Sequence, residues 1–94
     1  MRIGILNVEL FLHETHSLKQ KRFVIQQLKD KLRKRFNISI IEADYQDKWQ
    51  RSVIAMACIS GDTRIINSTF DKITDFIDEN KSGFEILNDE FEIM

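Results

Sequence analysis

The residues with the clearest capacity for chemistry are the lysines and arginines between residues 19 and 35. Eight cationic side chains stand here against Asp30 alone, which gives the segment a net charge of +7. Contacts from lysine and arginine to phosphate groups supply most of the sequence-independent affinity of proteins for nucleic acids. The segment therefore predicts a surface that binds a phosphate backbone. The alternative is a solvated helix face, partly neutralised by the acidic segment 71–94.

A second cluster combines aromatic and cationic side chains between residues 45 and 51. Tyr45 and Trp49 alternate with Lys48 and Arg51. Such a combination could stack bases or hold a partner, but a tryptophan near a strand end more often anchors the sheet, and we favour an anchor for Trp49. The glycine and paired aromatics of the usual RNA-recognition strand are absent from residues 51–60. RNA binding would therefore use helix and loop more than a sheet face.

These two segments define the candidate nucleic-acid interface. Its predicted residues are Lys19, Arg22, Lys29, Arg33, Lys34, Lys48, Trp49 and Arg51. Phe23 falls on the outward side of the same helix, where a large apolar side chain is unusual. It could stack on a base, pack against a partner chain or lie under the loop 13–16. Single exposed apolar side chains are also common, and we favour that interpretation.

Metal binding is a weaker possibility at two places. His13 and His16 flank a glutamate, but they are three residues apart in a predicted loop, whereas a zincin needs histidines four apart on a helix. Glu42, Asp44 and Asp47 could attract Mg²⁺ near a strand end. A solvated turn is the interpretation we favour for these three acids, and we predict no metal or cofactor.

No catalytic signature accompanies these residues. Cys58 alternates inside an apolar segment, which favours a small buried side chain, and no base is positioned to activate its thiol. A single cysteine also forms no internal disulfide and no zinc cluster. The sequence lacks a glycine-rich phosphate loop and a GxSxG turn. We therefore predict that the protein is not an enzyme.

The elements that position these residues follow from hydrophobic periodicity. Period-two alternation predicts strands at 2–12, 38–44, 51–60 and 84–93, the last one interrupted near residues 88–89. Ser17 with Gln20 forms a capping box before a helix that runs to residue 35 or 36. Asp62 caps a second helix, which Asn80 to Gly83 end.

The first helix has an apolar seam with cations on either side of it. The seam residues are Leu18, Ile25, Leu28, Leu32 and Phe36, with Val24 on one flank. At 100° per residue, Arg22, Lys29 and Arg33 form a stripe beside the seam. Lys31 and Arg35 flank its other side, and Lys19 and Lys34 point outward. In the second helix, Ile66, Phe70, Ile73 and Ile77 repeat the pattern, with aspartates outside.

The order of these elements is βαββαβ, which predicts an α+β, ferredoxin-like fold over a single domain, residues 1–94. Two right-handed crossovers place both helices on one face of a four-stranded antiparallel sheet. The strand at 51–60 places three apolar residues, Ile54, Met56 and Cys58, on the other face, and the strand at 2–12 adds to them. An uncovered apolar face predicts a homo-oligomer, or else a site for an apolar ligand.

The overall composition restricts the environment of the protein. The net charge is only −1, because segment 71–94 carries −6 and offsets the cationic segment. No apolar run approaches the roughly 20 residues of a membrane helix. The first residues lead directly into a strand pattern rather than a signal peptide. We expect a protein of the reducing cytoplasm, with no membrane partner.

Three stretches carry a family resemblance. They are Ser17-Leu18-Lys19-Gln20-Lys21-Arg22, Arg35-Phe36-Asn37-Ile38-Ser39 and Asp47-Lys48-Trp49-Gln50-Arg51. Together, after a strand that begins Arg2-Ile3-Gly4, they resemble the YlxP-like family of small bacterial proteins of unknown function. The similarity covers most of residues 1–60. Gln20 stands where the family more often has an acidic residue, so the first stretch is one charge more positive here.

The resemblance implies a ferredoxin-like fold and genes that often lie near those of translation and ribosome maturation. It brings no established activity and no residue roles. Residues and resemblance together favour a non-enzymatic module that binds RNA or associates with the ribosome through its basic helix. A dimeric module that binds protein or small molecules through the open sheet face is the alternative.

Overall fold

The computed structural model describes residues 1–79 and 83–94. Its elements are β1 (Arg2–Leu12), α1 (Leu18–Arg35), β2 (Ser39–Asp44), β3 (Arg51–Ser60), α2 (Thr63–Glu79) and β4 (Phe84–Ile93). The predicted βαββαβ order is confirmed. The prediction that residues 80–83 end α2 lies outside the described residues except for Gly83, whose φ of +90° is a conformation that glycine adopts readily.

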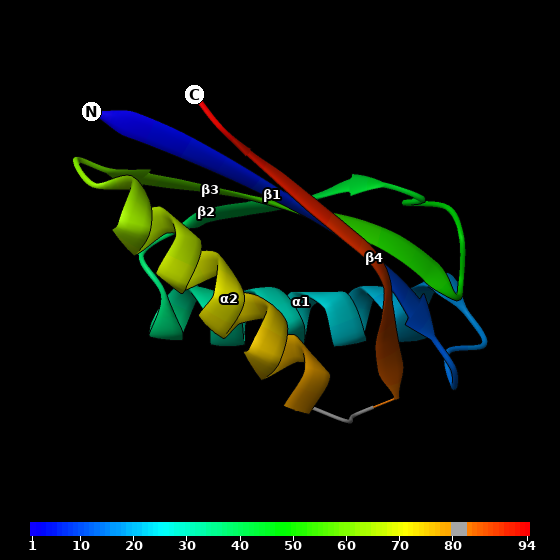
Figure 1. Cartoon of the computed structure of the whole chain (residues 1–94). Coiled ribbons are helices and arrows are strands. Elements are labelled where there is room, and N and C mark those ends of the chain that lie inside the picture. The colour runs from blue at the N-terminus through cyan, green and yellow to red at the C-terminus, as the bar shows by residue number, and fades with distance from the viewer. Residues whose placement is uncertain (80–82) are drawn as a thin grey trace.

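The four strands form one antiparallel sheet in the order β2-β3-β1-β4. Both helices pack on the same face, and the two ends of the chain lie side by side (Figure 1). This is the ferredoxin-like arrangement that the element order predicted. It leaves β2 and β4 as the edges of the sheet, and it leaves the second face without a helix. We call this second face the open face.

The core forms where the apolar faces of sheet and helices meet. Strand alternation buries every second residue of β1 and β3 beneath the helices, because successive side chains point to opposite faces. The main contributors are Leu6, Val8, Leu10, Ile54, Met56, Ile25, Leu28, Leu32, Ile66, Phe70, Ile73 and Ile77. Burying each large side chain stabilises the fold by roughly 1.5–3 kcal/mol. Cys58 is also buried, as its alternation predicted. The assignment of Ile54, Met56 and Cys58 to the uncovered face is wrong, because the register pairs them with Val8, Leu6 and Gly4 on the side that the helices cover.

The two helices begin at the predicted caps. The Ser17 hydroxyl accepts a hydrogen bond from the Gln20 amide at 3.1 Å. In return, the Gln20 side chain accepts from the backbone amide of His16 at 2.7 Å, one residue before the position that a capping box uses. Asp62 accepts from the Arg64 amide at 2.9 Å, so it does cap α2. Both helix starts therefore follow from local sequence.

One boundary and one internal feature differ from the prediction. Strand β2 begins at Ser39 rather than Ile38. Strand β4 continues across Asn88 and Asp89, but its register against β1 shifts beside Leu87, where one extra residue is accommodated. The interruption that the polar pair suggested is thus a bulge within a continuous strand.

Candidate nucleic-acid interface

The exposed side of α1 carries a cluster of cations that we call the basic face. It consists of Lys19, Arg22, Lys29, Lys31, Arg33, Lys34 and Arg35. All of these side chains are exposed except Lys29, which is half-buried. They lie outside because the apolar seam of the helix, at Ile25, Leu28 and Leu32, is held against the sheet.

Few carboxylates contact the basic face. Arg33 lies 3.4 Å from Asp30 on the same helix and also donates to the Ile40 carbonyl on β2, at 3.4 Å. Within residues 1–79 and 83–94, the other cations of the face have no acid within ion-pair distance, and no ion pair links α1 to α2. The acidic helix therefore lowers the potential of the basic face only at longer range.

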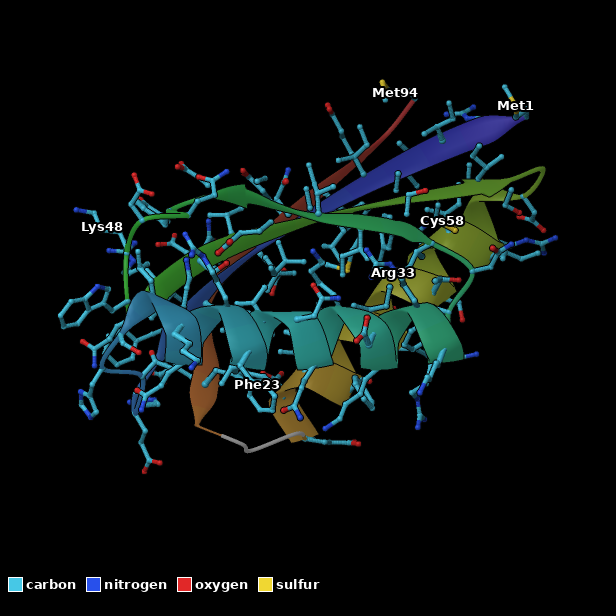
Figure 2. The ribbon with its side chains drawn as sticks, turned by 180° about the vertical axis from the view of Figure 1, so that it is seen from behind. Met1, Phe23, Arg33, Lys48, Cys58 and Met94 are labelled. Carbon is cyan, nitrogen blue, oxygen red and sulfur yellow. The ribbon has the colours of Figure 1, made fainter. Side chains whose placement is uncertain are left out.

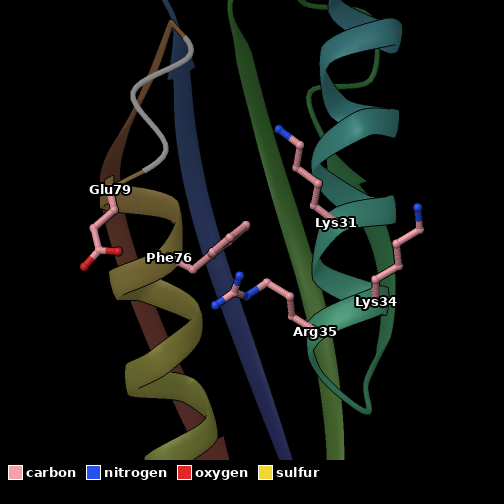
Figure 3. A pocket seen from close by; sticks show the side chains of 5 residues that line it. All are labelled: Lys31, Lys34, Arg35, Phe76 and Glu79. Carbon is pink, nitrogen blue, oxygen red and sulfur yellow. The ribbon is translucent and has the colours of Figure 1, made fainter.

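A groove separates the C-terminal parts of the two helices (Figure 3). It has a volume of about 510 Å³ and is lined by Lys31, Lys34, Arg35, Phe76 and Glu79. The Arg35 guanidinium lies 4.7 Å from the centre of the Phe76 ring. Figure 3 shows these two side chains reaching toward each other, while Lys34 and Glu79 point away. Across this groove, the two helices are joined by one cation–π contact rather than by an ion pair.

The second predicted cluster lies in the segment 45–50, which we call the Trp49 loop. The loop runs beside the beginning of α1, where Figure 2 labels Lys48. Lys48 and Trp49 are exposed, the latter at 54%. Thr15 donates to the Trp49 carbonyl at 2.5 Å, and Gln50 donates to the His13 carbonyl at 3.2 Å. The loop is therefore held against the segment that precedes α1.

The favoured interpretation of Trp49 as a sheet anchor is wrong. Its backbone carbonyl makes the contact with Thr15, while the indole remains at the surface. The ring projects from a loop rather than from a strand, so no strand periodicity directs it toward the core. An exposed tryptophan beside a lysine retains the capacity to stack on a base.

Arg51 lies apart from the other predicted residues. It is the first residue of β3 and projects from the open face, where it pairs with Glu9 of β1 and lies 4.8 Å from the centre of the Tyr45 ring. Alternation could have revealed this position, because Arg51 shares its face with Val53 and Ala55. The structure therefore does not bring Arg51 to the basic face.

Phe23 is 64% exposed and lies on the side of α1 away from the sheet (Figure 2). It borders a pocket of about 250 Å³ with Glu14, Thr15, Gln20, Val24 and Gly83. The loop 13–16 is thus a neighbour of the ring rather than its cover. Stacking and partner contact remain as the functions open to Phe23.

Lys21 has an environment that was not predicted from the sequence. Its side chain is fully buried, with Nζ 2.6 Å from the Glu42 carboxylate and donating to the Tyr45 carbonyl at 2.5 Å. The signal was present in the spacing, because steps of three and four lead from Leu18 through Lys21 to Ile25. A lysine therefore occupies a seam position that the pattern of apolar residues left empty.

The interpretation of the three acids as a solvated turn is wrong for Glu42, whereas Asp44 and Asp47 are exposed as it predicted. Glu42 faces the helices and pairs with Lys21 and the Ser52 hydroxyl, the latter at 2.6 Å. Asp44 accepts from the Tyr45 amide at 2.7 Å, and Asp47 is exposed. Among the residues described, no three histidine, cysteine or acidic side chains lie close enough together to hold a metal ion.

The sequence also matches a known family. The family model described as protein of unknown function, DUF503, matches residues 3–91. The chain belongs to the DUF503 family. Among relatives, the uncharacterized protein YlxP of Bacillus subtilis strain 168 is 33% identical over 76 residues, which are 81% of this chain and 83% of that protein. The resemblance to the YlxP-like proteins is thereby confirmed.

The fold of this DUF503 chain is similar to that of a solved structure. The de novo designed protein Foldit4 aligns over 100% of this chain and 97% of its own length, with a TM-score of 0.56 and 11% identity. At this identity the likeness concerns the fold alone. Neither helix described for this DUF503 chain has the length and apolar character to cross a membrane.

Proposed function

We propose that this DUF503 member is a non-enzymatic RNA-binding module of the bacterial cytoplasm that associates with the ribosome. The observation that carries the proposal is the basic face of α1, where seven cations stand against one acid, Asp30. A phosphate backbone is the partner that such a face fits best, because each neutralised phosphate releases bound counterions.

The dimensions of α1 suit this role. Its 18 residues span about 27 Å at 1.5 Å per residue, so cations along it can reach several successive phosphates. The Trp49 loop adds Lys48 and an exposed indole beside the beginning of the helix. The gene neighbourhood that the family resemblance implies, near translation genes, supports the same partner. The basic face supplies affinity, and the indole adds a stacking contact.

The test is binding of the full chain to structured RNA across a salt series that begins at about 50 mM. Arg22/Lys29/Arg33→Ala removes three cations from the basic face. We expect its affinity at low salt to fall at least about tenfold. The slope of log affinity against log salt should fall by about 2, since each phosphate contact contributes roughly 0.7–0.9.

A matched control removes the same charge elsewhere. Arg2, Arg64 and Lys72 are exposed and lie outside α1, so Arg2/Arg64/Lys72→Ala should keep both the slope and most of the affinity. The proposal fails if the wild-type protein does not bind at low salt. It also fails if the control loses as much affinity as the α1 variant.

The open face supports a second candidate, a homodimer. Ile41 and Ile59 are 60% and 63% exposed there. Beside Ile41, a shallow apolar hollow of about 230 Å³ includes Ile5 and the small residues Ala55 and Ala57. Uncovered apolar surface of this kind often marks a contact between protein chains.

Light scattering at increasing protein concentration tests the dimer. If the open face mediates association, the wild-type protein forms a dimer and Ile41/Ile59→Lys is monomeric, because each lysine would place a charge in an apolar contact. Lys31/Lys34→Glu, on the opposite side of the molecule, is the control and should remain dimeric. A monomeric wild-type protein would contradict this second function and leave the RNA proposal intact.

A further inference from the structure

Lys21 is surrounded by groups from three separate segments of the chain. Its ammonium group pairs with Glu42 at the end of β2, and Glu42 in turn accepts from Ser52 at the beginning of β3. The same ammonium group donates to the Tyr45 carbonyl, the first residue of the Trp49 loop, at 2.5 Å. The side chain is 0% exposed. No RNA phosphate can therefore reach it in this structure.

The Tyr45 carbonyl is also part of the turn that leads to Trp49. It accepts a second hydrogen bond from the Lys48 amide at 3.0 Å, which closes the turn from Tyr45 to Lys48. Tyr45 has a φ of +59°, a left-handed conformation that residues other than glycine rarely adopt and that surrounding contacts must hold. Lys21 reaches this turn from α1 through a direct hydrogen bond.

Burying an ion pair in a helix seam costs free energy, because both charges lose their contact with water. An apolar side chain of similar volume would often be equally or more stabilising, since it leaves no charge to desolvate. Such a side chain could not donate to a backbone carbonyl, however. The feature that Lys21 adds over an apolar residue is therefore its link between α1 and the turn 45–48.

We infer that Lys21 is a positioning residue that fixes the first half of the Trp49 loop against α1. Thr15 and Gln50 hold its second half through the Trp49 carbonyl and the His13 carbonyl. The loop is thus tied at both ends, and Lys48 and Trp49 extend the surface of the basic face. The consequence for RNA rests on the function proposed above, whereas the consequence for the loop does not.

Trp49 is the only tryptophan in the chain, so its fluorescence reports on this loop alone. Lys21→Met with Glu42→Gln removes both charges and keeps the side-chain volumes. We expect faster quenching by acrylamide and lower residual anisotropy than in the wild-type protein. Affinity for structured RNA should fall roughly tenfold, as for loss of one stacked base. It should fall little further when Lys48/Trp49→Ala is added.

Ile25→Val, at the next seam position, is the matched control. It weakens the core without contact with the Tyr45 carbonyl, so a general loss of packing would change the Trp49 signal in both variants. The inference is overturned if the Lys21 variant folds and its Trp49 signal stays that of the wild-type protein. If the wild-type protein binds no RNA, the proposed function fails, and the fluorescence still decides the role of Lys21.

A measurement on the unmodified protein covers the case in which the Lys21 variant does not fold. Native-state hydrogen exchange reports the opening of individual amides. The inference predicts that the Lys48 amide, in an otherwise exposed loop, exchanges as slowly as amides in the first turns of α1. Exchange at the rate of an open loop would overturn it.

Discussion

The lysines of α1 occupy two different environments, and this difference decides what each can do. Lys19 and Lys34 keep their charges in water, where an added phosphate can reach them. Lys21 is buried, and its ammonium group pairs with the Glu42 carboxylate. Removing one partner of such a pair leaves the other charge buried, which typically costs about 3–5 kcal/mol.

Glu42→Ala is the residue-scale prediction that follows. It should lower the free energy of unfolding by about 3 kcal/mol or more, because the ammonium group of Lys21 then stays buried with only the Tyr45 carbonyl. Urea denaturation measures the loss. Asp47→Ala removes an exposed acid nearby and should change stability by less than about 0.5 kcal/mol. Equal effects of the two substitutions would contradict a buried pair.

Among the secondary-structure elements, α2 packs tightly against β1 at Gly4. A Cβ added at Gly4 would lie 2.4 Å from Ile66 Cγ2 and 2.9 Å from the Phe70 ring. The missing side chain therefore lets the first turns of α2 rest directly on the strand. This contact sets the distance between helix and sheet, and with it the packing of the whole α2 seam.

Gly4→Ala tests this contact. The added methyl group must displace Ile66 or Phe70, and overpacking of this kind costs roughly 1–3 kcal/mol in the free energy of unfolding. Gly61→Ala is a suitable control, because an added Cβ there has nothing within 4 Å. Denaturation of both variants in urea measures the difference. Unchanged stability of Gly4→Ala would show that α2 adjusts without strain.

The N-terminus of α2 contains a pH-sensitive cap. A hydrogen bond from the Arg64 guanidinium, and then one from its backbone amide, hold the pKa of Asp62 below its ordinary value of 3.8. The pairing also raises the pKa of Arg64. Because the pKa of Asp62 is lowered on folding, its charge stabilises the fold at pH values above 3.8. This contribution is lost as the pH falls through the folded pKa.

Thermal unfolding of Asp62→Ala against pH measures this contribution. The melting temperature should lie below that of the wild-type protein at neutral pH, and the difference should shrink as the pH falls below 3.8. Asp62→Asn keeps an N-cap side chain without the charge. It should show a smaller difference at neutral pH, and this difference should shrink in acid as it does for Asp62→Ala, because the titrating carboxylate belongs to the wild-type protein. A deficit that stays constant for Asp62→Ala down to acid pH would exclude the carboxylate charge as its cause.

Across the whole molecule, the two helices place charges of opposite sign on opposite flanks of the sheet. The basic face of α1 lies over β2, whereas α2 and the edge strand β4 carry the acids at the other side of the sheet (Figure 1). The exposed acids are Asp71, Asp75, Asp78, Glu79, Glu85, Asp89, Glu90 and Glu92. A polyanion would therefore be attracted to one flank and repelled from the other.

Asp71/Asp75/Asp78→Asn tests how strongly the acidic flank opposes binding. No ion pair joins the two helices within residues 1–79 and 83–94. The aspartates should therefore weaken RNA binding only through long-range electrostatic repulsion. We expect RNA affinity to rise roughly two- to threefold at low salt, and the gain to vanish near 0.15 M salt, where the Debye length is about 8 Å. A gain that persists at high salt would instead indicate direct masking of α1.

Local sequence by itself determined the elements and their order. Periods of two and near 3.6, with caps at Ser17 and Asp62, depend on neighbours along the chain, and these led to βαββαβ and to the buried seam of α2. The cationic segment on α1 was predictable in the same way. Its exposure follows once the apolar seam is assigned, because the helix has only one buried side.

Only the tertiary structure decided what Lys21, Trp49 and Arg51 do. Lys21 is buried because Glu42 and the Tyr45 carbonyl, more than twenty positions away in the chain, meet it beneath the sheet. Trp49 is held through its backbone carbonyl, which accepts a hydrogen bond from Thr15, and its ring is left exposed. Such pairings join segments that no local period connects. Their charges are compensated only once the fold has brought the partners together.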